Sequence, residues 1–156
     1  MSLSENLEKL SNASGVVGRE EEVRNLMVEL MKPHVDEVCL DKLENVIAVK
    51  KGRKNAPKVM LAAHMDEIGL MVKTVNKEGF LQFVKMGGID DRILLAQKVI
   101  VQSSKGPMHG IIGSKPPHIQ KEEERKKIVT FDELFIDIGA ESKEDVAKME
   151  IGRAHV

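Results

Sequence analysis

The sequence predicts an α/β protein in two parts, an α/β lobe over residues 1–68 and a small antiparallel β-rich domain over residues 69–152. Two segments with apolar residues at helical spacing come first, and strand candidates follow them. After Gly69 short strand-like runs alternate with turn signals. A chain of 156 residues has room for one ordinary domain or for two small ones.

The α/β lobe begins with two predicted helices. Residues 4–10 form the first, with Ser4 as its N-cap. Residues 20–31 form the second, which carries apolar residues on one face and is ended by Pro33. The segment between them, residues 11–18, is rich in turn-forming residues and predicts a break.

Three strand candidates follow the helices, at residues 37–40, 45–50 and 58–63. The last contains Val59-Met60-Leu61 and is nearly all apolar, which is typical of a strand covered on both faces in an α/β sheet. Within residues 1–68 alone, strand edges and an apolar face would be open to solvent. We therefore expect this lobe to be poorly ordered by itself or buried by self-association.

The second part of the chain reads as a small antiparallel barrel or sandwich, because short strands recur at regular spacing. Strands are predicted at residues 70–75, 80–85, 98–103, 110–112 and 134–139. The charged run at 121–127 predicts a solvated loop or a short helix face. Ser142, with Asp145 three residues later, predicts the N-cap of a short helix that ends at Met149.

Composition excludes several classes of protein. The net charge of −1 and the absence of a basic stripe interleaved with aromatic residues argue against a nucleic-acid partner. The apolar stretches are far shorter than a membrane span, and the polar start is no signal peptide. The single cysteine, Cys39, excludes an internal disulfide and a cysteine-rich zinc site. These features predict a cytoplasmic protein without a membrane partner.

His64 and Asp66 are the candidate site residues. They follow an apolar run at the point where ligands collect in open α/β sheets, the carboxyl end of a strand. Side chains at i and i+2 of an extended chain project to the same face, so Asp66 is placed to accept a hydrogen bond from the imidazole. A lone histidine in this position is more often a core or loop residue than a ligand, and the pattern by itself leaves both readings open.

The sequence around His64 decides between a metal ligand and an ordinary core or loop residue. The stretch Ala62-Ala63-His64-Met65-Asp66-Glu67-Ile68-Gly69-Leu70-Met71-Val72 resembles the metal-site strand of the tetrahedral (TET) aminopeptidases, the family of glutamyl and deblocking metallo-aminopeptidases. Further segments resemble the same family in the same order: Gly87-Gly88-Ile89-Asp90, Leu95-Ala96-Gln97-Lys98-Val99, residues 113–120 and residues 135–142. The chain is thus identified as an amino-terminal portion of that family from about Leu7 to Gly152.

The resemblance implies a peptidase that uses two divalent metal ions, zinc or cobalt, to remove amino-terminal residues from peptides. His64 matches a ligand of one metal, and Asp66 matches the catalytic carboxylate that orients it. The family's remaining ligands and its glutamate base have no counterpart here. Because a catalytic zinc usually takes three protein ligands, we expect at most one partial metal site and no activity from this chain alone.

The resemblance also explains the change after residue 68. The family's catalytic α/β domain is interrupted by a β-rich domain that builds dimers and then a dodecamer. Residues 69–152 match that inserted oligomerisation domain, and residues 1–68 match the first lobe of the catalytic domain. His118 lies in a family motif, where turn structure is favoured over a contact near the site or an interface.

Two positions depart from the family pattern. A turn glycine is expected where this chain has Glu44, which would be strained by about 1–2 kcal/mol if the turn needs a positive φ. An apolar strand is expected after Gly152, whereas residues 153–156 form an atypical tail, Arg153-Ala154-His155-Val156, that reads as frameshifted or vector-derived.

Two other functions stay open. One is a non-catalytic assembly or dimerisation module that is stable through its β domain. The other is a carbohydrate hydrolase such as an endoglucanase, which needs two opposed carboxylates and usually aromatic sugar platforms. Asp66 and Glu67 point to opposite faces of an extended chain and aromatic residues are few, so this function ranks last.

Overall fold

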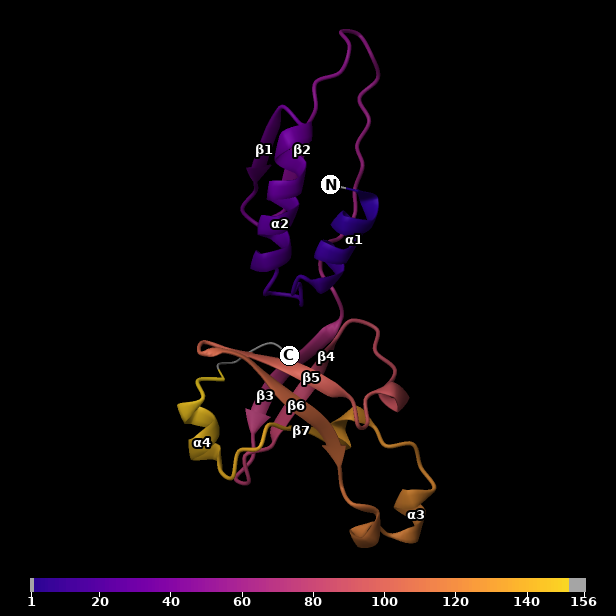
Figure 1. Cartoon of the computed structure of the whole chain (residues 1–156). Helices are drawn as coiled ribbons and strands as arrows, with labels where there is room; N and C mark the ends of the chain where they lie inside the picture. Colours follow the sequence, from indigo (N-terminus) through magenta and orange to yellow (C-terminus); the bar gives the residue numbers. More distant parts are fainter. Residues whose placement is uncertain (1, 152–156) are drawn as a thin grey trace. The chain divides into compact units, whose positions relative to one another are not determined.

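The structure, a computed structural model, describes residues 2–151 and divides into two compact units, Met1–Glu67 and Ile68–Val156. We call them unit 1 and unit 2 and describe each by itself (Figure 1). The predicted tail at residues 153–156 lies outside the described residues. Among the described residues, no helix is long and apolar enough to cross a membrane.

Unit 1 opens with two helices, α1 (Leu3–Asn12) and α2 (Glu21–Met31). The N-cap of α1 is Ser2, so the prediction of Ser4 was wrong. Ser2 caps because Glu5 stands at the third helical position: the Glu5 amide donates to Ser2 Oγ at 3.2 Å, and the Ser2 amide donates to Glu5 Oε2 at 2.6 Å. Helix α2 ends at Met31 as predicted and continues as the 3-10 turn η1 (Lys32–His34).

Two short antiparallel strands follow, β1 (Glu37–Leu40) and β2 (Val46–Val49), at two of the predicted positions. Asp41 holds the turn between them, because its Oδ1 accepts from the Leu43 amide at 2.8 Å and from the Asn45 amide at 2.9 Å. The pKa of Asp41 is lowered, chiefly by the Asn45 side-chain amide. Glu44 has a φ of 66°, which confirms the strained backbone expected there.

The predicted third strand at residues 58–63 is not formed, and that prediction was wrong. Residues 50–66 form no helix or strand, and Figure 1 draws them as a long trace that leaves β2 and returns alongside the helices of unit 1. A strand requires a hydrogen-bonded neighbour, and the described residues of unit 1 provide none for this segment. Its apolar side chains therefore stay in solvent.

Unit 2 is built on one five-stranded antiparallel sheet, in the order β3-β4-β7-β6-β5. The strands agree with the predicted positions within a few residues, and their bounds are β3 (Gly69–Val75), β4 (Leu81–Met86), β5 (Lys98–Ser103), β6 (Gly106–Ser114) and β7 (Leu134–Asp137). Strands β3 and β5 are the two edges, with no pairing between them among the described residues. The antiparallel character is as predicted, and the barrel-like closure is not confirmed.

The core of unit 2 gathers on one face of this sheet. Its most buried members come from β4, β5, β6, β7 and helix α4 (Lys143–Lys148): Leu81, Val101, Ile112, Ile136 and Val146. Ser142 caps α4 by accepting from the Asp145 amide at 3.2 Å, which confirms the predicted cap. The core therefore fastens α4 onto the sheet.

Four short elements complete unit 2. They are η2 (Asp91–Ile93), η3 (Pro117–Ile119), α3 (Glu122–Arg125) and η4 (Phe131–Glu133). His118 lies in η3, and the predicted charged run contains α3.

Candidate functional site

The candidate site lies in unit 1, where residues 61–66 run past the helices. A cavity of about 670 Å³ separates this segment from α2 and from the turn before β2. Its wall is mixed, with apolar side chains from α2 and charged ones at the turn. The lining residues include Val23, Arg24, Met27, Met31, Glu44, Val46, Leu61, His64 and Asp66.

His64 and Asp66 are in contact. The His64 Nδ1 atom lies 3.0 Å from the backbone carbonyl oxygen of Asp66 and 3.3 Å from its Oδ1 atom. Both contacts use Nδ1, so Nε2 is the imidazole nitrogen left for another ligand. The His64 side chain is 83% exposed and that of Asp66 is 42% exposed. The backbone oxygen and the carboxylate of Asp66 thus both hold the imidazole through Nδ1.

Glu67 fastens the segment that carries His64 to the loop between α1 and α2. The Glu67 amide donates to the Gly15 carbonyl at 2.8 Å, and the Gly15 amide donates to Glu67 Oε1 at 3.1 Å. Val16 and Glu67 form a parallel β-bridge. Gly15 is required because a Cβ atom there would lie 2.9 Å from Val23 Cγ1. Sequence reasoning read this loop only as a break, since no local signal reveals a contact between residues 52 positions apart.

Arg24 is a second feature that sequence reasoning missed. It is 8% exposed, and its Nη1 donates to Glu44 Oε2. Its Nε atom is buried and has no hydrogen-bond partner among the described residues. The predicted apolar face of α2 did not include Arg24, because amphipathic patterning assigns a charged side chain to the solvent.

The donors in the described residues are too few for a catalytic metal pair. No group of three or more His, Cys, Asp or Glu side chains is placed to hold a metal ion among residues 2–151. A catalytic zinc takes three protein ligands, whereas unit 1 offers one imidazole with one carboxylate beside it. These residues themselves supply one imidazole, held through Nδ1, and one carboxylate beside it.

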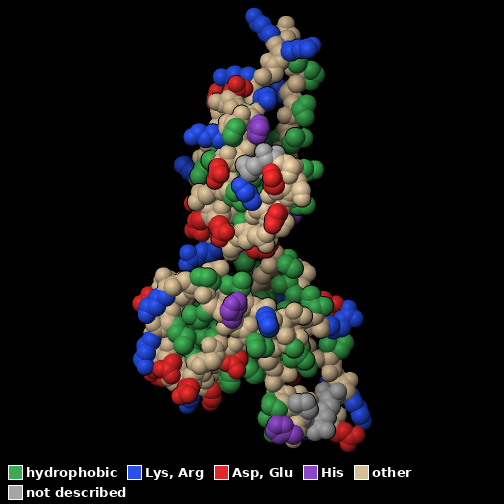
Figure 2. All heavy atoms as spheres, viewed as in Figure 1, with side chains coloured by type: hydrophobic (Ala, Val, Ile, Leu, Met, Phe, Trp, Pro, Cys, Tyr) green, Lys and Arg blue, Asp and Glu red, His purple; other side chains and the backbone are tan. Residues whose placement is uncertain are grey.

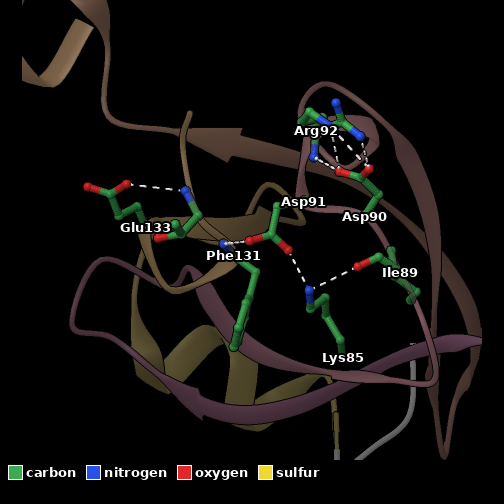
Figure 3. Close-up of polar contacts among 8 residues, drawn as sticks. Lys85, Ile89, Asp90, Asp91, Arg92, Phe131 and Glu133 are labelled. Carbon is green, nitrogen blue, oxygen red and sulfur yellow. Dashed lines mark hydrogen bonds and ion pairs between the residues drawn. The ribbon is translucent and has the colours of Figure 1, made fainter. Parts of the chain in front are cut away.

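A separate polar cluster in unit 2 includes Ile89 and Asp90 from the end of the segment Gly87-Gly88-Ile89-Asp90 (Figure 3). Lys85 Nζ donates to Asp91 Oδ1 at 2.5 Å and to the Ile89 carbonyl at 2.9 Å, and it lies 4.9 Å from the centre of the Phe131 ring. Asp91 Oδ2 accepts from the Phe131 amide at 3.1 Å. The hydrogen bond from Lys85 lowers the pKa of Asp91, and one from Arg92 lowers that of Asp90. Lys85 and Asp91 thus join β4, η2 and η4, which is a structural task.

Comparison with known proteins places the chain among aminopeptidases. The model of the M42 glutamyl aminopeptidase family matches residues 44–156. The lysyl aminopeptidase of Pyrococcus furiosus is 42% identical over 145 residues, which are 92% of this chain and 41% of the relative. The putative aminopeptidase FrvX of Escherichia coli is 42% identical over 149 residues, or 94% of this chain and 41% of FrvX.

Several solved structures also resemble this chain. A TET aminopeptidase from a marine-sediment Thaumarchaeota archaeon superposes with a TM-score of 0.91 at 43% identity, covering 97% of this chain and 42% of the other. The Pyrococcus horikoshii TET1 peptidase, described as assembling into a tetrahedron or a large octahedral shell, gives 0.83 at 37% identity, covering 99% and 46%. A Thermotoga maritima protein named endoglucanase gives 0.77 at 35%, covering 96% and 43%. The chain spans 41% of the length of the first curated relatives it matches.

Proposed function

Because the chain belongs to the M42 glutamyl aminopeptidase family, we propose that it is the His64-bearing part of a metal-dependent aminopeptidase. His64 is the metal ligand and Asp66 the catalytic carboxylate that orients it. The observation that carries this proposal is the contact of His64 Nδ1 with the backbone oxygen of Asp66, at 3.0 Å, and with its Oδ1 atom, at 3.3 Å. It holds the imidazole with Nε2 available, as a second partner of a ligating histidine does.

The complete enzyme takes a peptide as substrate and uses two divalent ions, zinc or cobalt, which supply Lewis-acid activation when bound. In this proposal residues 1–68 are the first lobe of the catalytic domain. Residues 69–152 are the inserted, barrel-like oligomerisation domain, through which copies assemble as homo-oligomers. The assembly attributed to the Pyrococcus horikoshii peptidase supports the oligomer, and the single cysteine supports a cytoplasmic location.

A hybrid enzyme tests the proposal. The 145 matched residues of the Pyrococcus furiosus lysyl aminopeptidase are replaced by the corresponding residues of this chain, and release of p-nitroaniline from lysine p-nitroanilide is measured with Zn²⁺ or Co²⁺. We expect an active hybrid, in which His64→Ala costs at least about 100-fold and Asp66→Asn about 10–100-fold. The matched control is His109→Ala on an exposed position of β6, which leaves the activity unchanged. Equal losses in both histidine variants would refute the assignment of His64.

Two alternatives have distinct outcomes in the same experiment. A hybrid that assembles but hydrolyses nothing favours the non-catalytic assembly module. The endoglucanase name of the Thermotoga maritima protein is the observation that favours a carbohydrate hydrolase. In that case the hybrid cleaves carboxymethylcellulose, and Glu67→Gln, as well as Asp66→Asn, removes that activity.

A further inference from the structure

Half of the cations of unit 1 lie in one loop, residues 50–58, which we call the basic loop. It contains five cations and no acidic residue: Lys50, Lys51, Arg53, Lys54 and Lys58. The rest of residues 1–67 contains five cations and twelve acidic residues. With histidine neutral, the basic loop therefore carries a charge of +5 in a unit whose other residues carry −7. Such a separation of charge favours a negatively charged partner for the loop.

The basic loop is open to solvent. Each of its residues is exposed, and Figure 2 shows Lys and Arg side chains in blue at the upper end of unit 1, where Figure 1 draws the loop. A β-turn shapes its tip: the Ala56 amide donates to the Arg53 carbonyl at 3.2 Å, and Asn55 has a φ of 69°. Arg53 and Lys54 therefore lie next to each other in an ordered turn.

Most of these cations have no acidic partner in the described part of the chain. Lys51 is the exception, because its Nζ lies 2.9 Å from Glu37 Oε1 and its amide donates to Asp36 Oδ2 at 2.5 Å. Among residues 2–151, no ion pair is formed by the other four: Lys50, Arg53, Lys54 and Lys58. Carboxylates that approach the loop would relieve the repulsion among these cations. Arginine can also hold a carboxylate through two parallel hydrogen bonds.

An acidic polypeptide fits the basic loop better than a nucleic acid does. The loop contains no aromatic residue on which a base could stack. It also lies close in sequence to the candidate site, because six residues lead from Lys58 to His64, a length of chain that spans at most about 22 Å. An extended peptide whose amino-terminal residue lies at His64 therefore reaches Lys58 within about seven residues.

We propose that the basic loop binds acidic stretches of polypeptide, and that in the aminopeptidase these stretches belong to the downstream part of the substrate. The role in substrate binding rests on the proposed function, whereas the binding itself does not require it. Attraction between the loop and a negatively charged chain speeds their encounter and lowers KM for substrates with acidic residues beyond the first few positions. A substrate too short to reach the loop gains nothing.

Fluorescence anisotropy tests the binding with this chain alone. The probe is a peptide that begins with lysine, continues with a neutral stretch long enough to reach from His64 to Lys58, and ends in a run of glutamates with fluorescein at the carboxyl end. The comparison peptide has glutamines in place of the glutamates. We expect the glutamate peptide to bind at least about 10-fold more tightly at low ionic strength, and this difference to vanish in about 0.5 M NaCl.

Arg53→Glu and Lys42→Glu form a matched pair of variants. Both reverse one exposed cation of unit 1, but Lys42 lies in the turn before β2, at the opposite end of that strand from the basic loop. Arg53→Glu is expected to weaken binding of the glutamate peptide at least about 10-fold, and Lys42→Glu less than about 2-fold. Equal losses in the two variants overturn the proposal, as does equal binding of the two peptides by the unchanged chain.

Two other occupants of the basic loop give different results. If inorganic polyphosphate binds more tightly than the glutamate peptide, the proposal is overturned in favour of a phosphate polymer. Sedimentation velocity detects the other case, in which the chain alone self-associates at low ionic strength and Arg53→Glu abolishes this association. That result also overturns the proposal, because the loop then binds the acidic surface of a second copy.

Hydrolysis by the hybrid enzyme separates this proposal from the proposed function. For the unlabelled glutamate peptide, Arg53→Glu should raise KM at least about 10-fold and leave kcat unchanged. Hydrolysis of lysine p-nitroanilide should stay the same, because that substrate is too short to reach the loop. An active hybrid with equal KM for the two peptides refutes the role of the basic loop alone. Binding of the glutamate peptide together with an inactive hybrid retains the binding and refutes the enzyme function.

Discussion

Replacing Glu44 by glycine sets two effects of the 41–45 turn against each other. Glu44 holds a φ of 66°, a conformation that costs an L-residue about 1–2 kcal/mol. Glycine relieves this strain, but its greater backbone freedom also stabilises the unfolded chain by about 0.5–1 kcal/mol. The backbone effect alone therefore stabilises unit 1 by about 0.5–1 kcal/mol.

The side chain acts in the opposite direction. Glu44 accepts a hydrogen bond from Arg24, whose side chain is 9% exposed, while the Glu44 side chain is 61% exposed. Leaving a buried donor unpaired costs about 1–3 kcal/mol. Because water reaches the exposed Glu44 end of the pair, we expect the lost hydrogen bond to cost about 1–2 kcal/mol. The net prediction is that Glu44→Gly lowers the free energy of unfolding of unit 1 by about 0.5–1 kcal/mol.

Arg24→Met provides the matched background, because it removes the ion pair and keeps an apolar stem of similar length. In this background Glu44→Gly should raise the free energy of unfolding by about 0.5–1 kcal/mol. The sign of the glycine effect thus reverses, with a coupling energy of about 1–2 kcal/mol in the double-mutant cycle.

Urea unfolding monitored at Cys39 measures these differences. The chain has no Trp or Tyr, and its single cysteine is exposed on β1, so a fluorophore attached there reports unit 1. Equal stabilisation by glycine in both backgrounds would show that Glu44 and Arg24 do not interact. Destabilisation in the Arg24→Met background would show that residue 44 is not left-handed.

Three further perturbations have defined outcomes. Gly15→Ala places a Cβ atom 2.9 Å from Val23 Cγ1 and should cost unit 1 about 1–3 kcal/mol in urea unfolding; an unchanged midpoint would contradict the close approach of the loop. Gly110→Ala places a Cβ atom 2.6 Å from a side chain of β7 and should lower the melting temperature of unit 2, seen by circular dichroism, while Cys39 fluorescence stays unchanged. Because Lys85 lowers the pKa of Asp91 below 3.8, the unfolded state binds the more protons. The ion pair of Lys85 and Asp91 therefore stabilises unit 2 above pH 3.8, and this stabilisation is lost as the pH falls through the lowered pKa of Asp91. Asp91→Asn should make the stability of unit 2 depend less on pH in this acid range. An unchanged pH dependence would refute the ion pair.

The sequence predicted elements whose signals are local. Strand β5 was placed at its observed bounds, and α2 was placed correctly because Pro33 and a helical apolar stripe act within a few residues. The Ser142 cap is equally local. The Ser4 cap failed because two serines compete and only Ser2 has a glutamate at the required third position.

Elements that depend on distant partners were predicted less well. Residues 58–63 have the composition of a buried strand, yet pairing is a property of the neighbour and not of the segment. The order of the sheet in unit 2 brings β7 between β4 and β6, which no spacing along the chain indicates. At the candidate site, the i, i+2 rule placed His64 beside Asp66, whereas the contact between Glu67 and Gly15 joins segments that sequence patterns treat as unrelated.

The metal content of the hybrid enzyme tests the central claim, that His64 is a metal ligand of an M42 aminopeptidase, most directly. The hybrid and its His64→Ala variant are purified in parallel, dialysed against metal-free buffer, and analysed by inductively coupled plasma mass spectrometry. We predict that the hybrid retains both divalent ions per chain and that His64→Ala loses at least one of them while keeping its far-UV circular dichroism. Full metal content in the His64→Ala variant would contradict the assignment of His64 as a ligand.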